Sequence, residues 1–276
     1  MMNSQQEDSK DTNAEGNDSC SFDVLDHYRN FADKYDYFYK EAHQGYIPIL
    51  MKCLDVKPEH VVADIGSGTG AIAKDLFELS GLHNPIWCVD PSVEMQEVAR
   101  QKKGVYPVVK TAEEFFSNRQ ISDRFDRVLT NVSAHHFVNP DAPGAVYKGI
   151  LRSLRPGGIF VQVNVLKNSP PLFKSANKLM SQFYEREREI SSLLLREVGL
   201  NANVSQQEVF LSWGVTKSKL YECYRCRFFS FFQHLSDDQI EEGITELENE
   251  HYQNVKEDDL INYESTVLVT RVEKVS

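Results

Sequence analysis

The stretch VVADIGSGTGAIAK, residues 61–74, joins a short apolar run to a helix-like pattern through three glycines. The run over 61–65 predicts a buried strand, and Gly66, Gly68 and Gly70 occupy every second position after it. A strand followed by a glycine loop and a helix is typical of the first unit of a parallel sheet, where ligands bind beyond the carboxyl ends of the strands. This unit therefore predicts both the fold class and the position of a binding site.

Strands and helices alternate on the carboxyl side of this unit. Apolar runs predict strands over 86–90, 105–109, 125–130, 159–165, 207–215 and 263–272. Three- and four-residue apolar spacing predicts helices over 22–54, 93–102, 143–154, 173–198, 217–229 and 237–249. The alternation predicts an α/β doubly wound, mostly parallel seven-stranded sheet with an antiparallel last strand and helices on both faces.

The chain divides into a tail and one domain. Residues 1–21 are polar and almost free of apolar side chains, which predicts a disordered N-terminal tail. Residues 22–276 form the predicted domain, with a helical N-terminal addition and a helical lid insertion at about 168–205. The charged, amphipathic segment 173–198 in that insertion has a simpler interpretation as a solvated surface helix.

Composition excludes several classes of protein. The formal net charge of −11 argues against a polyanion as the main partner, so no nucleic acid is expected. Apolar runs are too short to cross a bilayer, and no signal peptide is recognisable, so no membrane partner is expected. Five cysteines without framework spacing favour a reduced, cytoplasmic location. The oligomeric state stays open.

Two ligand classes compete for the glycine loop. Gly66, Gly68 and Ala71 satisfy a loose dinucleotide fingerprint, in which the glycines let a pyrophosphate approach the start of a helix. Asp64, two residues before the first glycine, would repel such a dianion. The loop therefore suits a ligand with a cationic part better, and a ligand-free turn is disfavoured because repeated glycine weakens a helix start.

The pattern resembles motif I of class I S-adenosylmethionine-dependent methyltransferases, of the small-molecule type. Further matches extend roughly from Tyr28 to Val165 and include Asp90 after the second strand, with Ser92 and Met95 behind it. The resemblance implies S-adenosyl-L-methionine as the cofactor and a small-molecule methyl acceptor as the partner. One departure is Thr111, which stands where the family often has an aspartate beside the adenine.

The resemblance also implies a set of cofactor-binding residues. Asp64 would hold the ammonium, Asp90 the ribose hydroxyls, and Tyr35 the carboxylate end of the cofactor. The full set implied is Tyr35, Asp64, Gly66, Ser67, Gly68, Gly70, Asp90, Pro91, Met95, Ala112, Glu113 and Asn131. No metal ligands are predicted.

Methyl transfer from a sulfonium needs alignment and, for some acceptors, a base. His135 and His136 follow the fourth strand and are the candidate bases, although a consecutive pair usually points in opposite directions. Asn131 lacks the Pro-Pro-aromatic continuation of enzymes that methylate nucleobase or amide nitrogens. Arg225 and Arg227 are weaker candidates for binding an acceptor carboxylate.

The sequence leaves several functions open. The preferred function is methyl transfer to a small molecule. The alternatives are a protein or RNA methyltransferase, a catalytically silent cofactor-binding protein, and a nicotinamide-dinucleotide dehydrogenase.

Overall fold

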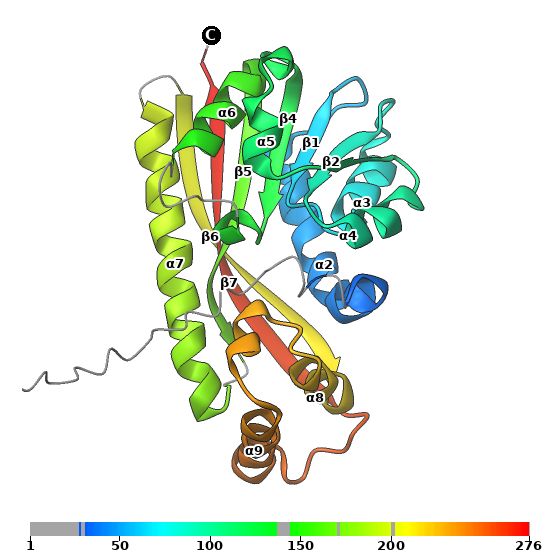
Figure 1. The fold of residues 1–276 in the computed structure, drawn as a ribbon, viewed down its shortest axis with the longest axis vertical. Coiled ribbons are helices and arrows are strands. Elements are labelled where there is room, and N and C mark those ends of the chain that lie inside the picture. The colour runs from blue at the N-terminus through cyan, green and yellow to red at the C-terminus, as the bar shows by residue number, and fades with distance from the viewer. Residues whose placement is uncertain (1–27, 29–30, 137–143, 170–171, 200–201, 276) are drawn as a thin grey trace, which may run out of the picture.

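A computed structural model describes residues 28, 31–136, 144–169, 172–199 and 202–275 (Figure 1). The strands are β1 (Val62–Ile65), β2 (Ile86–Asp90), β3 (Val105–Val109), β4 (Phe125–Asn131), β5 (Leu154–Ser169), β6 (Ala202–Thr216) and β7 (Leu260–Lys274). The α-helices are α2 (Ala32–Leu54), α3 (Ala71–Ser80), α4 (Val93–Arg100), α5 (Ala112–Ser117), α6 (Ala145–Ser153), α7 (Lys174–Val198), α8 (Lys217–Arg225) and α9 (Asp237–Leu247). Short helical turns include η2 (Ala134–His136) and η4 (Ser230–His234).

The strands form one seven-stranded sheet in the order β3-β2-β1-β4-β5-β7-β6. The first five strands are parallel, and β7 runs antiparallel to both of its neighbours. The predicted fold class is confirmed. The chain leaves β1 toward β2 on one side and returns to β4 on the other, so a crevice opens beyond the carboxyl ends of β1 and β4.

Two apolar layers cover the sheet and a third cluster extends it. Side chains of α2 and α3 pack on one face, and those of α5, α6 and the C-terminal part of α7 pack on the other. The four side chains of β1 are all buried, as expected for a strand covered on both faces. Figure 1 shows the long β6–β7 pair continuing past the parallel strands to α8 and α9, where the third cluster lies.

The predicted element boundaries and the predicted lid differ from the structure in a few places. The helix predicted over 217–229 ends at Arg225, and β6 begins at Ala202, inside the predicted lid range of 168–205. The helical part of that range is α7, which contacts β5, α6 and η2 over its length. The predicted tail, residues 1–21, lies outside the described residues.

Candidate functional site

Two cavities meet beyond the carboxyl ends of β1 and β4. The first, the glycine-loop cavity, has an empty volume of about 810 Å³. It is lined by Tyr28, Tyr35, Gly66, Gly68, Val89, Asp90, Pro91, Met95, Thr111, Ala112, Glu113, Asn131, Val132, Ser133 and His136. This lining contains two acids and no Lys or Arg among the described residues, which is unfavourable for a pyrophosphate.

The backbone of the glycine loop adopts conformations that only glycine takes easily. Gly68 has a φ of +52°, and a Cβ placed there would point toward Tyr35 Cε1 at 4.0 Å. Gly70 has a φ of +70° and caps α3, and its Cβ would lie 3.3 Å from Ala99 Cβ. Gly68 therefore leaves space in the cavity, whereas Gly70 permits close packing behind the loop.

A buried glutamine holds the loop in place. Gln96 is fully buried on α4, and its Nε2 donates to Ser67 Oγ at 3.2 Å and to the Gly68 carbonyl at 3.1 Å. Its Oε1 accepts from the Val108 amide at 3.0 Å. Gln96 thus joins the loop to β3, and no pattern in the sequence indicated this role.

Asp90 links the glycine loop to the start of α4. Its Oδ2 accepts from the Gly68 amide at 2.9 Å, and its Oδ1 accepts from the Ser92 amide at 3.0 Å. Burial raises the pKa of Asp90, and these two donors oppose the rise. Both oxygens keep acceptor capacity for a ligand, because a carboxylate offers about four lone-pair sites.

Asp64 is buried at the end of β1, behind the loop. Burial, followed by the nearby charge of Asp90, raises the pKa of Asp64 to about 7. A carboxyl group with a pKa near 7 is only partly ionised at neutral pH, so a nearby cation would stabilise its charged form. Asp64 is not itself part of the cavity lining, and neither are Ser67 and Gly70.

The remaining predicted residues come together around the same cavity. The side chain of Met95 lines the cavity and is 2% exposed. Pro91 also lines the cavity and lies in the turn that leads into α4. Ala112 and Glu113 begin α5, and Thr111 caps that helix by accepting the Glu114 amide. The threonine therefore has a helix-capping role at the position where the family often has an acid, and it also lines the cavity.

The end of β4 separates the two cavities. Asn131 lines the glycine-loop cavity, and its buried Oδ1 has no hydrogen-bond partner among the described residues. The next residue, Val132, has a φ of +52°, a conformation that a β-branched residue rarely takes. Val132 lines both cavities, so this strained turn forms part of their common wall.

The second cavity, called the aromatic cavity, has an empty volume of about 980 Å³. Its aromatic lining comes from Tyr28, which precedes α2, and from α2, α7, β6, β7 and the segment around η4. These elements contribute Tyr35, Phe38, Tyr39, Tyr46, Phe183, Trp213, Phe228, Phe229, Phe231 and Tyr263. Tyr35 was predicted from the sequence to lie at the site, whereas the aromatic residues of the C-terminal half were not.

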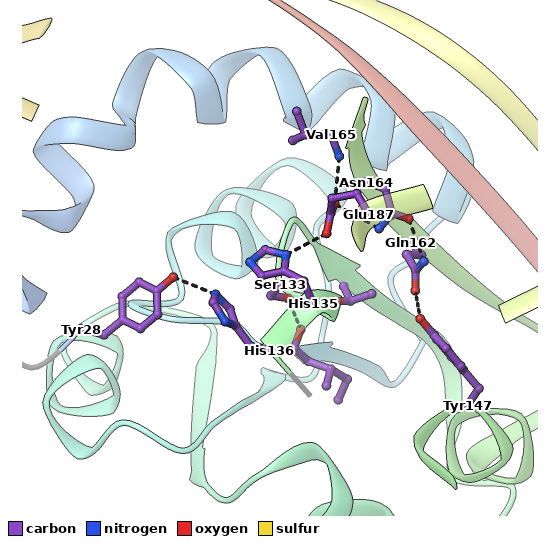
Figure 2. Close-up of polar contacts among 11 residues, drawn as sticks. Tyr28, Ser133, His135, His136, Tyr147, Gln162, Asn164, Val165 and Glu187 are labelled. Atoms are coloured by element: carbon purple, nitrogen blue, oxygen red, sulfur yellow. Dashed lines mark hydrogen bonds and ion pairs between the residues drawn. The ribbon is translucent and has the colours of Figure 1, made fainter. Parts of the chain in front are cut away.

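The consecutive histidines face different cavities. His135 lines the aromatic cavity and His136 lines the glycine-loop cavity. Figure 2 shows His136 pointing toward Tyr28, with 2.9 Å between its Nε2 and the tyrosine hydroxyl. The expectation that the pair points in opposite directions is wrong, because the two rings lie 4.0 Å apart between their centroids and both line cavity walls.

His135 belongs to a buried network of polar side chains that was not predicted from the sequence (Figure 2). Its Nδ1 lies 2.8 Å from Oε1 of Glu187, which is fully buried on α7. Oε2 of Glu187 accepts from Asn164 Nδ2 at 3.1 Å and from the Val165 amide at 3.0 Å. An acid in register with Phe183 and Ile190 on the apolar face of α7 was the available sequence signal.

The weaker candidates have structural partners. Arg225 forms two hydrogen bonds with Glu241, and Arg227 pairs with Asp237 and the Leu235 carbonyl. Within the described part of the chain, no group of three metal-ligating side chains forms and no helix is long and apolar enough to cross a membrane.

The region that contains the glycine loop is also the region that matches known proteins. Residues 63–162 match the family model described as "Methyltransferase domain". A cyclopropane-fatty-acyl-phospholipid synthase of Escherichia coli K12 is 27% identical over 122 residues, which cover 44% of this chain and 30% of that protein. A ubiquinone/menaquinone biosynthesis C-methyltransferase of Wigglesworthia glossinidia brevipalpis is 25% identical over 167 residues, 56% of this chain and 63% of that protein. The chain thus spans less than two thirds of either curated relative.

Solved structures share the fold. A putative methyltransferase of Haloferax volcanii, in complex with an activator, superposes with a TM-score of 0.57 at 15% identity, covering 92% of this chain and 98% of that one. A phosphoethanolamine N-methyltransferase of Haemonchus contortus, crystallised with S-adenosyl-L-methionine, gives 0.54 at 18% identity, covering 90% of this chain and 60% of that one. Residues 63–162, which hold the glycine loop and strands β2 to β4, therefore resemble a methyltransferase domain, and the solved structures share its fold.

Proposed function

We propose that this chain transfers the methyl group of S-adenosyl-L-methionine to a small-molecule acceptor by in-line displacement. The observation that carries the proposal is the meeting of the two cavities at Tyr28, Tyr35 and Val132. A cofactor in the glycine-loop cavity and an acceptor in the aromatic cavity would lie next to each other where the two linings share these residues. Such alignment is the main requirement for a displacement that needs no covalent intermediate.

The glycine-loop cavity fits the cofactor chemically. The unpartnered Asn131 Oδ1 supplies an acceptor, and the open space beside Gly68 lets backbone approach a ligand. We assign Asp90 to the ribose hydroxyls and Met95 and Ala112 to the adenine edge. Asp64, which lies behind the loop, is assigned to the ammonium through a bridging water. When bound, the sulfonium supplies the electrophilic methyl group, and the residues of this chain orient it and exclude water.

The acceptor is assigned as a small molecule because the aromatic cavity lies among α2, α7, the end of β6–β7 and the segment around η4. The named relatives act on a quinone precursor, a phospholipid or phosphoethanolamine, so their names do not decide the acceptor. A protein or RNA acceptor, or a silent cofactor-binding protein, remains an outcome of the test.

The test combines calorimetry with label transfer. S-adenosyl-L-methionine is expected to bind at one site per chain, and extracts of small molecules incubated with the methyl-labelled cofactor should yield a labelled compound. Preference for a nicotinamide dinucleotide would contradict the cofactor assignment. Binding without any label transfer would indicate a silent cofactor-binding protein, and label in protein or RNA would overturn the acceptor class.

Cofactor affinity is expected to depend on pH through Asp64, whose pKa of about 7 follows from burial and from Asp90. The ammonium prefers the ionised carboxylate, so affinity should rise as pH increases from about 6 to 8 and then level off. Binding near pH 7 should release a proton. Calorimetry in two buffers with different ionisation heats measures that release.

Asp64→Asn is the matched variant for this pH dependence. It keeps the side-chain size and removes the titration, so affinity should be lower and nearly independent of pH in this range. An unchanged pH slope in Asp64→Asn would show that another group, such as the cofactor's own amine, produces it.

A further inference from the structure

We propose that the aromatic cavity takes an uncharged aromatic acceptor bearing a hydroxyl or amine, and that His135, positioned by Glu187, accepts the proton of that group. This inference rests on the proposed function and specifies its substrate class and its base. It follows from two observations: the charge of the cavity wall and the hydrogen bonds behind His135.

The wall of the aromatic cavity lacks a cation for an anionic acceptor. Among its described residues there is no Lys or Arg, and the lining acid, Glu41, is already paired with Lys219 on α8. Burying a phosphate or carboxylate here would leave a charge unpaired, which is costly. The aromatic side chains instead offer flat apolar surface, which favours a flat and neutral molecule.

An oxygen or nitrogen nucleophile must also carry a free lone pair when it reacts, so it cannot attack the methyl group while that lone pair is protonated. Aromatic walls attract cations in general, but a protonated amine must first lose its proton. A hydroxyl or an amine hydrogen therefore needs an acceptor within the cavity. His135 is the histidine in this wall, and its side chain is 10% exposed.

The Glu187 network fixes which nitrogen of His135 can accept that proton. Glu187 receives N–H donors from Asn164 and Val165 on Oε2, and it faces His135 Nδ1 with Oε1. A carboxylate only accepts hydrogen bonds, so Nδ1 carries the hydrogen and Nε2 keeps its lone pair. Asn164 Oδ1 in turn accepts from Gln162, whose Oε1 accepts from Tyr147, so the network holds its orientation (Figure 2).

The transfer step balances as follows. The lone pair of the acceptor oxygen or nitrogen forms a bond to the methyl carbon while the methyl–sulfur bond breaks. The sulfur keeps the electron pair of that bond and becomes a neutral thioether. The acceptor proton passes to Nε2 of His135, and the Glu187 carboxylate stabilises the resulting imidazolium.

The first test compares 1-naphthol with 1-naphthyl phosphate, two probes that differ only by the phosphate. Each is titrated into the complex with S-adenosylhomocysteine, and binding is followed by naphthyl fluorescence. We expect 1-naphthol to bind at least about 100-fold more tightly than the phosphate, since no cation pairs with the dianion. Equal affinity, tighter binding of the phosphate, or no saturable binding of 1-naphthol would overturn the substrate class.

The second test is E187Q, with label transfer to 1-naphthol as the measurement. The Gln amide oxygen is expected to keep the Asn164 and Val165 donors, so its NH₂ turns to His135 and forces the wrong tautomer. The kcat should fall about 100-fold or more, while KM and cofactor affinity stay within about twofold. E185Q, an exposed acid on the same helix, is the matched control and should behave as wild type.

The outcomes separate this inference from the proposed function. Loss of cofactor binding in the wild-type protein would contradict the proposed function itself. Cofactor binding with unchanged kcat in E187Q, or with kcat and cofactor affinity falling together, would overturn the positioning role alone. Bound 1-naphthol that receives no label would overturn the assignment of His135 as base.

Discussion

Gly68→Val is expected to abolish measurable binding of S-adenosyl-L-methionine while the protein still folds. The Cβ at this position meets only Tyr35 Cε1, at 4.0 Å, so the valine has room in the ligand-free protein. Its branched side chain would occupy the space assigned to the cofactor. Overfilling a fitted site costs about 1–3 kcal/mol, and the upper end of that range corresponds to an affinity about 150-fold lower. Calorimetry measures the affinity, and thermal unfolding confirms the fold.

Gly81→Val is the matched control for backbone strain. Gly81 caps the other end of α3 with a φ of +65°, and its Cβ would meet nothing within 4 Å. Both valines carry the cost of a left-handed conformation, roughly 1–2 kcal/mol, so both variants should lose similar stability. Cofactor affinity should change only in Gly68→Val. Equal affinity in the two variants would remove the glycine loop from the binding site.

Asp90→Ala is expected to weaken the cofactor by at least about 100-fold. Hydrogen bonds to a charged group contribute about 1.5–3 kcal/mol each, and two ribose hydroxyls are assigned to this carboxylate. The variant also removes the acceptors for the Gly68 and Ser92 amides, so the loop loses its link to α4. The measurement is again calorimetry, with S-adenosylhomocysteine as the ligand.

A cycle with the 2′-deoxyribose form of S-adenosylhomocysteine separates the ribose contact from the loop contact. If Asp90 binds the ribose, removal of the hydroxyl should weaken the wild-type complex and cost little more in Asp90→Ala. Additive losses would mean that Asp90 acts only by holding Gly68 and Ser92. In that case the ribose assignment fails, and the loop assignment stands on Gly68→Val.

Strand positions were predictable where the local pattern was unambiguous. The expected bounds of β2 and β3 agree with the structure, because short apolar runs between breaking residues have one interpretation in a covered parallel sheet. Asp90, Met95 and Glu113, which the family resemblance implied as cofactor-binding residues, line one cavity. The strands that precede these residues are parallel neighbours in the sheet. The order of the strands in the sequence therefore determines that their carboxyl ends lie at the same edge.

Contacts between distant segments were not predictable in this way. Glu187 follows His135 by a long stretch of chain, and nothing local to either residue indicates the other. The side chain could be recognised only as an acid on the wrong face of α7. The same limit applies to Trp213 and Phe228, whose place in the aromatic cavity depends on how the end of the sheet folds back on α2.

The sequence by itself determined the doubly wound sheet, the glycine loop and the acids around it, because these depend on local periodicity and on the order of parallel strands. Only the tertiary structure decided which histidine faces which cavity, what holds His135, and that the second cavity is lined by aromatic rings. Those features arise from packing between segments far apart in the chain, and the free energy of such packing depends on shape and burial that no local pattern encodes.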